Sequence, residues 1–413
     1  MAAKSRGTLG VIGQGYVGLP LAMSAVKAGW DVIGFDVLRS KVDSLNLGDS
    51  PIEDIPDSVL TDAINLGKYV ATTDFSLVSQ ASVIVICVPT PLNEDREPDV
   101  SLLTSAVRAL APFITSDALI VNESTSYPGT LRELIVPLVN ECKKMTVDRL
   151  YFASAPERVN PADPVWNQKN TPRLLGAIDE ESRIRALDFY SSICDQVVLV
   201  STPEVAEAAK LLENAFRLIN ISFINEVASI FSGSGINVHE VIDAASTKPY
   251  GFMPFKPSVG VGGHCIPVDP LYLSWWAQKN DFKTTLIKAA DSINISAPKY
   301  VGQRALDLID KEPQAIRILI LGVAYKPGIS DTRETPVRGL KDFLEDKGVE
   351  VAWHDPIVKN WDESEPVQLD WSCDLAILAT NQPGIQFEQL LNRGVPILDC
   401  TNSIAGLPGV FSL

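Results

Sequence analysis

The stretch GVIGQGYVGLP, residues 10–20, constrains the fold more than any other part of the chain. Residues 8–35 run from a short apolar segment through these glycines and an amphipathic stretch to a second apolar segment, DVIGF. Two buried parallel strands joined by a helix have this pattern, because the helix covers one face of the sheet. The sequence therefore predicts a strand-helix-strand unit at the start of a parallel sheet.

The glycines also predict a binding site for a dinucleotide. The loop has the pattern G-x-G-x-x-G and comprises Gly13, Gly15 and Gly18, with Tyr16 and Val17 between the last two. Gly13 permits the turn, Gly15 lets a pyrophosphate approach the helix N-terminus, and Gly18 allows close helix packing. The alternative is a glycine turn that binds no ligand.

One carboxylate distinguishes between the cofactors NAD and NADP. Asp36 follows the second apolar segment at about the distance expected of an acid that bonds both ribose hydroxyls of NAD. The same negative charge repels the 2′-phosphate of NADP. We therefore expect NAD.

Further apolar segments predict two α/β domains. In the first half they are SVIVICVP (82–89), ALIVNES (118–124) and YFASAP (151–156), and in the last part IRILILGVAY (316–325), VEVAWHDP (349–356), DLAILAT (374–380) and VPILDCT (395–401). Between them, residues from Pro203 onward keep helical spacing for roughly 30 positions without Gly or Pro, and 285–311 predict another helix. The long helix is also a plausible dimer spine.

The expected fold class is α/β, with two Rossmann-like doubly wound domains joined by a long central helix and a helical dimerisation segment. The expected domains are 1–200, which binds the dinucleotide, 201–300, which is helical and carries a cysteine loop, and 301–413, a smaller α/β domain. In such sheets ligands bind at the carboxyl ends of the strands. A cleft between the two domains is the expected active site.

Composition limits the partners. With 35 Lys+Arg against 51 Asp+Glu, the net charge is −16, which repels nucleic acid and anionic membranes. The uncharged run 7–26 is broken by glycines and a proline, unlike a signal peptide, and no other stretch is long enough to span a bilayer. We expect a cytoplasmic protein. Its six cysteines include no C-x-x-C pair, so no metal site and no disulfide framework is expected.

Cys265 is the first candidate for chemistry. It lies in VGVGGHCIPVDP, residues 259–270, where Gly262 and Gly263 allow close approach of a ligand. His264 and neighbouring lysines are candidates to lower the thiol pKa, and Asp269 is a candidate base. Such a thiol suits the capture of an aldehyde. The alternative is a buried cysteine in a turn.

Other polar residues occupy positions typical of catalytic groups. Lys210 and Asn214 are four residues apart on the long helix, so they share a face and can hold an alkoxide. Glu157 follows a strand end and a proline, and Ser124 and Thr125 follow another strand. The alternatives are a solvated lysine and asparagine, a solvated loop carboxylate, and hydroxyls that cap a helix beginning near Pro128.

The whole chain, from Gly10 to about Thr401, resembles the UDP-glucose/UDP-N-acetylhexosamine 6-dehydrogenase family, and within it the UDP-N-acetylglucosamine branch. Eight motifs carry the resemblance in family order: GVIGQGYVGLPLA, VPTPLNED, ESTSYPGT, PERVNP, KLLENAFRLINISFINE, GFMPF, VGGHCIPVDPLYL and GVAYKPGISDTRETP. The resemblance implies oxidation of a sugar C6 alcohol to a carboxylate with two NAD+, a UDP-sugar-binding third domain, a homodimer, and a role in surface polysaccharide or glycan precursor synthesis.

The resemblance also implies roles for individual residues. Cys265 matches the nucleophile that forms a thiohemiacetal and then a thioester, and Asp269 matches the aspartate linked to water and proton transfer. Residues implied near the cofactor beyond the glycine loop and Asp36 are Pro89, Thr90, Ser124, Thr125 and Arg333. Thr125 and Glu157 are implied near the hydrolytic water. Residues implied near the substrate are Glu157, Arg158, Val159, Lys210, Asn214, Tyr250, Phe252, Phe255, Gly262 and Lys326.

Three alternatives remain at this point. A UDP-N-acetylmannosamine 6-dehydrogenase keeps every catalytic residue, and the glucosamine branch is favoured by Pro267, where the mannosamine branch more often has alanine. A two-electron 3-hydroxyacid dehydrogenase has a dinucleotide fold with Lys and Asn four apart, but lacks the cysteine and the second α/β domain. A non-enzymatic NAD-binding protein is the third.

Overall fold

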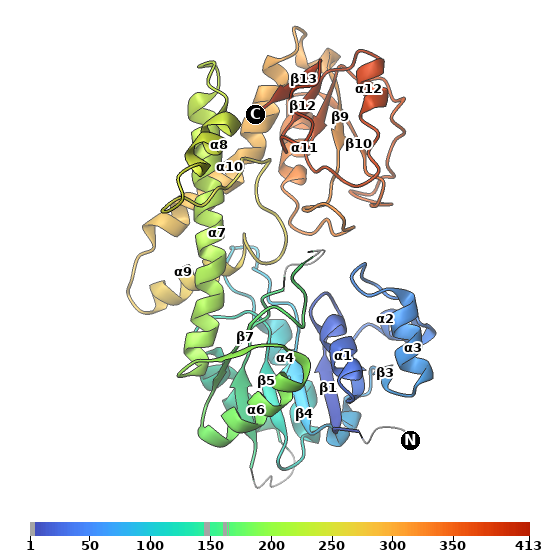
Figure 1. The fold of residues 1–413 in the computed structure, drawn as a ribbon, viewed down its shortest axis with the longest axis vertical. Helices are drawn as coiled ribbons and strands as arrows, with labels where there is room; N and C mark the ends of the chain where they lie inside the picture. The colour runs from blue at the N-terminus through green and yellow to red at the C-terminus, as the bar shows by residue number, and fades with distance from the viewer. Residues whose placement is uncertain (1–4, 144–148, 160–162, 164) are drawn as a thin grey trace. The chain divides into compact units, whose positions relative to one another are not determined.

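A computed structural model describes residues 5–143, 149–159, 163 and 165–413 of the chain. The chain forms two compact units (Figure 1). The first comprises residues 1–213 with 271–280, and the second comprises 214–270 with 281–413. Each unit contains its own sheet.

The first unit is built on an eight-stranded sheet with the order β3-β2-β1-β4-β5-β6-β7-β8. Its strands are β1 (Thr8–Ile12), β2 (Asp31–Phe35), β3 (Tyr69–Thr72), β4 (Val83–Ile86), β5 (Leu119–Asn122), β6 (Tyr151–Ser154), β7 (Arg173–Ala177) and β8 (Val197–Leu199). The strands from β3 to β6 are parallel, as predicted. The strand β7, which lies outside the predicted segments, runs antiparallel to β6.

Helices cover both faces of this sheet. They are α1 (Gly18–Lys27), α2 (Arg39–Leu47), α3 (Asp57–Asn65), α4 (Ser101–Leu110), α5 (Val136–Cys142) and α6 (Glu180–Ile193), with short helical turns η1 (Phe75–Gln80), η2 (Ala111–Phe113) and η3 (Leu131–Ile135). The strands are apolar throughout because both faces are buried. In β4, for example, Val83 and Val85 join the core beneath α1 and α6, whereas Ile84 and Ile86 join the core beneath α4 and α5.

The long helix α7 extends over Pro203–Phe231, which confirms the predicted helix of roughly 30 residues. It begins in the first unit and continues into the second. The other helices of the central region are α8 (Val238–Ser246), α9 (Asp269–Lys279) and α10 (Thr285–Asp307). In the described part of the chain, no helix is long and apolar enough to cross a membrane.

The second unit contains a parallel sheet with the order β10-β9-β11-β12-β13. Its strands are β9 (Arg317–Leu321), β10 (Glu350–His354), β11 (Leu375–Leu378), β12 (Ile397–Asp399) and β13 (Val410–Ser412), with helices α11 (Val337–Asp346) and α12 (Glu388–Asn392) and the turn η4 (Pro313–Ala315). Separate apolar cores cover its two faces. The predicted α/β fold with a long central helix is confirmed.

Candidate active site

Of the three glycines in the loop, Gly15 alone has open space beside it for a ligand. A side chain on Gly13 would place its Cβ 2.6 Å from the carbonyl oxygen of Cys87, and one on Gly18 would lie 1.9 Å from the carbonyl oxygen of Gly13. Beside Gly15, apart from its chain neighbours, no described residue places an atom within 4 Å of a Cβ. The open space at Gly15 lies where a pyrophosphate would approach the start of α1, so the loop fits a dinucleotide.

Asp36 lies against the backbone of the same loop. Its Oδ2 accepts a hydrogen bond from the backbone N–H of Gln14 at 3.1 Å and pairs with Lys41 Nζ at 2.9 Å. Its Oδ1 accepts from the backbone N–H of Leu38 at 3.1 Å. The carboxylate is therefore held in one orientation at the end of β2, where a ribose of NAD would lie.

The predicted residues after β4 and β5 gather at the carboxyl edge of the sheet. Ile86 is in register with Ile12 and with Asn122, so the segments that follow these residues leave the sheet side by side. The Ser124 hydroxyl accepts from the backbone N–H of Val88 at 2.9 Å, and Thr90 Oγ1 donates to the carbonyl of Thr125 at 2.6 Å.

These hydroxyls therefore join the two loops. Pro89 is exposed and Thr125 is half-buried beside them. The helix predicted to begin near Pro128 starts with the turn η3 at Leu131.

Glu157 begins the next loop at this edge. Its backbone N–H donates to the carbonyl of Glu123 at 3.4 Å, and its carboxylate accepts from the backbone N–H of Val159. Arg158 is predicted to contact the substrate. In the structure its guanidinium forms an ion pair with Glu213 of α7, with Nη2 2.6 Å from Oε1 and Nε 3.1 Å from Oε2. Glu157 and Arg158 are half-buried, and residues 160 and 161 of the PERVNP motif lie outside the described residues.

The predicted polar face of α7 is buried. Lys210 is 6% exposed and Asn214 is 5% exposed, so the alternative of a solvated lysine and asparagine is wrong. Asn214 Nδ2 donates to Oδ2 of the buried Asp269 at 2.5 Å. The structure thus brings together two predicted residues that are far apart in the sequence, and both belong to the second unit.

Cys265 is exposed, whereas Cys87, Cys194 and Cys400 are buried. The alternative of a buried turn cysteine is therefore wrong. The Cys265 carbonyl accepts from the backbone N–H of Asp269 at 2.8 Å, so the thiol lies one tight turn before α9. This turn and the Asn214–Asp269 bond fix the cysteine loop to α7.

Arg217 is a residue that the sequence reasoning missed. Although the residue is exposed overall, partial desolvation lowers the pKa of its guanidinium, and negative charge on the Cys265 sulfur opposes that shift. A cation near the thiol favours the thiolate. The signal was present in the sequence, because Arg217 continues the spacing of Lys210 and Asn214 along one helix face.

His264, in contrast, does not supply that positive charge. Burial and the nearby Arg333 lower the pKa of His264, so its imidazole is neutral at pH 7. The expectation that His264 lowers the thiol pKa is therefore not supported by the structure.

The glycines before Cys265 have a packing role. A Cβ on Gly262 would lie 2.6 Å from the carbonyl oxygen of Glu334, and a Cβ on Gly263, whose φ is +82°, would lie 2.9 Å from the Tyr325 ring. The cysteine loop therefore rests on the loop that follows β9, which carries the motif GVAYKPGISDTRETP. We predicted that Gly262 admits substrate, but the space for its side chain is taken by protein.

The loop after β9 also holds the predicted basic residues. Arg333 pairs with the buried Asp331 through two contacts, Nε to Oδ1 at 2.8 Å and Nη2 to Oδ2 at 2.6 Å. Lys326 is half-buried in the same loop. Both therefore lie at the carboxyl end of the second sheet, where α/β folds bind ligands.

The segment TKPYGFMPF is the most exposed part of the predicted site. Tyr250 and Phe252 are exposed, and Lys248 Nζ lies 5.0 Å from the centre of the Tyr250 ring. Phe255 packs edge-on against Phe216 of α7, with ring centres 5.9 Å apart.

A parallel sheet with a glycine loop and Asp36 at its carboxyl edge is typical of an NAD-dependent oxidoreductase. The chain matches the three parts of one such family in order: its NAD binding domain over residues 7–194, its central domain over 204–296 and its UDP binding domain over 319–404. The chain belongs to the UDP-glucose/GDP-mannose dehydrogenase family. It is an NAD-dependent UDP-sugar dehydrogenase.

Relatives and solved structures agree on the family. The UDP-N-acetyl-D-mannosamine dehydrogenase of Pyrococcus horikoshii is 34% identical over 379 residues, which cover 91% of this chain and 89% of the relative. Protein CapL of Staphylococcus aureus is 34% identical over 84% of this chain and 81% of its own.

Among structures, the UDP-D-ManNAc dehydrogenase from Pyrococcus horikoshii has a TM-score of 0.87 at 31% identity, covering 98% of both chains. A UDP-glucose dehydrogenase from Pyrobaculum islandicum has a TM-score of 0.87 at 27% identity, covering 95% of this chain and 94% of that one. The names of these relatives favour the mannosamine alternative over the predicted glucosamine branch.

Proposed function

We propose that this protein oxidises the C6 hydroxyl of a UDP-N-acetylhexosamine to a carboxylate, reducing two NAD+, and that UDP-N-acetylmannosamine is its preferred substrate. The single observation that carries the chemistry is the exposed Cys265 thiol one turn from the Asn214–Asp269 pair. The names of the relatives support the mannosamine configuration. UDP-N-acetylglucosamine is the second candidate, favoured by Pro267.

NAD+, held by the glycine loop and Asp36, would supply the hydride acceptor for each of the two oxidations. The buried Lys210 ammonium and the Asn214 amide stabilise negative charge on the C6 oxygen as the alcohol loses its proton and a hydride. Such a preorganised donor contributes roughly 10²–10³-fold to the rate. Because these groups are already desolvated, they need little rearrangement as charge develops.

The Cys265 sulfur then bonds to the aldehyde carbon, and the thiol proton passes to the aldehyde oxygen, giving a thiohemiacetal. Loss of a second hydride and a proton gives a thioester. Water adds to the acyl carbon, the carbon–sulfur bond breaks, and the products are the carboxylic acid and the free thiol. Asp269 and Glu157 are the carboxylates proposed to accept the protons of these steps.

The proposed product is a UDP-N-acetylhexosaminuronic acid, a precursor for surface polysaccharide made in the cytoplasm. Purified protein is supplied with UDP-N-acetylmannosamine, UDP-N-acetylglucosamine or UDP-glucose and excess NAD+, and NADH is counted per sugar consumed. We expect two NADH per sugar and the highest kcat/KM with UDP-N-acetylmannosamine. One NADH supports a two-electron dehydrogenase, none supports a binding protein, and a preference for UDP-N-acetylglucosamine selects the second candidate.

A further inference from the structure

A fully buried ion pair lies beneath the two loops that carry Thr125 and Glu157. Arg173, the first residue of β7, is 2% exposed and Glu123, the residue after β5, is 0% exposed. Arg173 Nη1 lies 3.2 Å from Glu123 Oε2, a charge contact without hydrogen-bond geometry. Neither residue was among the predicted site residues.

Arg173 also holds the backbone that leads into Glu157. Its Nη1 donates to the carbonyl oxygens of Ala155 at 3.2 Å and Pro156 at 3.4 Å. The last regular contact of this strand is the Ala155 N–H to the Asn122 carbonyl at 3.0 Å, so these two carbonyls leave the sheet and need other donors. Arg173 supplies them from below the loop.

Glu123 completes the arrangement on the other side. Tyr190 of α6 donates through its hydroxyl to Glu123 Oε1 at 2.6 Å. The backbone carbonyl of Glu123 accepts from the N–H of Glu157. Glu123 continues directly into Ser124 and Thr125, so one charged pair connects the origins of both loops.

The chemistry of the side chains explains why an arginine is needed here. A guanidinium is planar and carries five N–H donors, so one group can bridge a carboxylate and two carbonyls, whereas a lysine ammonium is a point charge with three donors. A buried ion pair is by itself weak support for stability, because desolvation offsets the attraction. Its contacts here point to position: Arg173 Nη1 meets the two carbonyls that lead into Glu157, and Glu123 Oε1 meets Tyr190 of α6.

We propose that Arg173, with Glu123 and Tyr190, is a positioning residue that orients the Glu157 carboxylate for cleavage of the thioester. This inference rests on the proposed function. In that step a proton passes from the attacking water toward Glu157 while the acyl carbon–sulfur bond of Cys265 breaks. A displaced Glu157 loop leaves both oxidations intact and slows hydrolysis.

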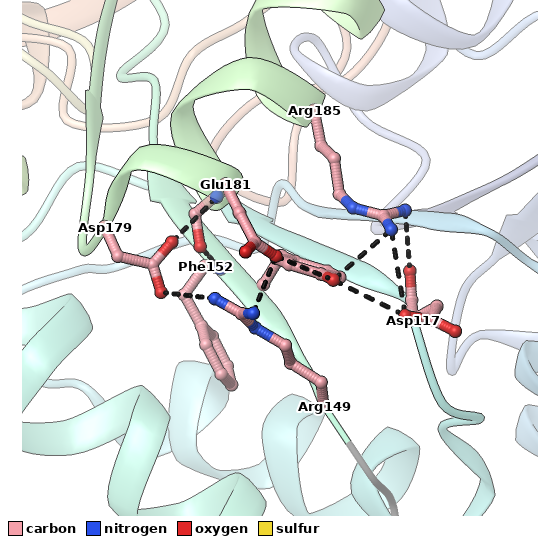
Figure 2. Close-up of polar contacts among 8 residues, drawn as sticks. Asp117, Arg149, Phe152, Asp179, Glu181 and Arg185 are labelled. Carbon is pink, nitrogen blue, oxygen red and sulfur yellow. Dashed lines mark hydrogen bonds and ion pairs between the residues drawn. The ribbon is translucent and has the colours of Figure 1, made fainter.

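The same unit offers a matched control at the other edge of its sheet. Arg149 precedes β6, and its Nη1 lies 2.7 Å from Glu181 Oε2 (Figure 2). Arg185 and Asp117 extend this cluster, with Arg185 Nη2 3.7 Å from Asp117 Oδ1. These side chains are partly exposed at the amino ends of the strands, away from the loops that follow the carboxyl ends.

The test compares the native protein with Arg173→Lys, Tyr190→Phe and Arg149→Lys. Each is mixed with the UDP-N-acetylhexosamine that the native protein oxidises and with excess NAD+. NADH is followed by stopped flow, and quenched samples are weighed by mass spectrometry for an acyl adduct on the protein. Glu157→Gln alone and combined with Arg173→Lys completes a double-mutant cycle.

For Arg173→Lys we expect a fast release of two NADH per site, then turnover slowed roughly 10–100-fold, with the acyl adduct accumulating. The KM values fall together with kcat because the adduct accumulates, and kcat/KM stays within about twofold because the steps up to acylation are not disturbed. The Tyr190→Phe variant retains the aromatic ring and should therefore fold. It is expected to slow hydrolysis about 2–10-fold because it loses one hydrogen bond. Arg149→Lys behaves as native, and the double variant is no slower than Glu157→Gln alone.

Hydrolysis of the adduct at the native rate in Arg173→Lys, or losses that multiply in the double variant, would overturn this inference while the proposed function stands. No NADH from the native protein with any UDP-hexosamine would overturn the proposed function and this inference with it. If Arg173→Lys does not fold, Tyr190→Phe and its combination with Glu157→Gln decide by the same readouts.

Discussion

At the scale of single residues, the proposed function depends on the Cys265 thiol. Cys265→Ser replaces a sulfur that leaves readily from an acyl group with an oxygen that does not, so turnover is expected to fall on the order of 10³-fold or more. Binding of NAD and of UDP-sugar should persist, as measured by calorimetry. Cys142→Ser, at the half-buried end of α5, is the control and should turn over normally. Near-native turnover of Cys265→Ser excludes the nucleophile.

Arg217 is the cation that we expect to act on that thiol. Its guanidinium favours the thiolate, so Arg217→Gln is expected to raise the apparent pKa of Cys265 by about one unit. The measurement is the rate of alkylation by iodoacetamide across pH 6–10, with Cys265→Ser as the blank that identifies the labelled site. An unchanged pH profile means that Arg217 does not act on the thiol.

Spacing predicted part of this site and could not predict the rest. Lys210 and Asn214 are four apart on one helix, so their shared face follows from helix geometry alone. The contact of Asn214 with Asp269 is a tertiary contact, which periodicity does not report. Arg173 belongs to no motif. Its proposed positioning role depends on hydrogen bonds to the carbonyls of Ala155 and Pro156, which exist only in the folded loop.

At the scale of elements, α7 was predictable because its interior lacks Gly and Pro and keeps one apolar period throughout. The reversed direction of β7 was not predictable, because a short apolar run has the same appearance in either direction of pairing. Strand direction depends on the connection between β6 and β7. The described residues of this connection include no helix that could return the chain for a parallel pairing.

α7 is anchored to the first unit by Glu207. The buried carboxylate accepts N–H bonds from Gly129 at 2.7 Å and Leu131 at 3.1 Å, next to the loop of Thr125. Burial raises its pKa from 4.5 to about 8, partly opposed by these two bonds.

The raised pKa gives stability a pH dependence with a definite sign. Between pH 4.5 and about 8 the folded chain holds a proton on Glu207 that the unfolded chain has released. This contribution is complete below pH 4.5 and is lost as the pH rises through about 8.

We therefore expect the Tm of the native protein to fall more steeply from pH 6 to 9 than that of Glu207→Gln, by differential scanning fluorimetry. Glu226→Gln, which removes an exposed carboxylate further along α7, is the matched control and should follow the native curve. Parallel curves for native protein and Glu207→Gln contradict the assignment.

The exposed apolar face of α7 predicts a homodimer. Phe216, Phe223 and Ile230 recur every seven residues and are all exposed, with Phe223 58% and Ile230 65% accessible. Side chains at this spacing form one stripe, which is the geometry of paired helices.

We propose that a second copy covers this stripe. Phe223→Glu combined with Ile230→Glu should convert a dimer to a monomer in size-exclusion chromatography with light scattering. Leu47→Glu, an equally exposed leucine at the end of α2, should leave the mass unchanged. A monomeric native protein, or a dimeric double variant, contradicts the proposal.

At the scale of the whole molecule, the two units hold different ligand sites. The glycine loop and Asp36 belong to the first unit, and the loop of Lys326 and Arg333 belongs to the second. A ligand that binds only the folded form stabilises the unit that binds it, by about 2.7 kcal/mol at one hundred times its Kd.

Calorimetric unfolding should therefore show NAD raising one transition and UDP raising another. Each ligand is tested alone and at several concentrations, with Asp36→Ala as the variant expected to lose the NAD effect and keep the UDP effect. A single transition raised equally by both ligands means that the two units unfold as one.

The open space beside Gly15 separates the requirement for folding from the requirement for cofactor binding, two requirements that usually act on the same residue. Gly13 and Gly18 are required by the protein's own backbone, so a screen for folded protein and a screen for activity reject their replacement alike. An alanine side chain at Gly15 would contact no described residue beyond its chain neighbours, so we expect Gly15→Ala to leave the stability of the fold unchanged. In a mutational library selected for stability, other small residues would be accepted at position 15. Only selection for catalysis would require glycine there.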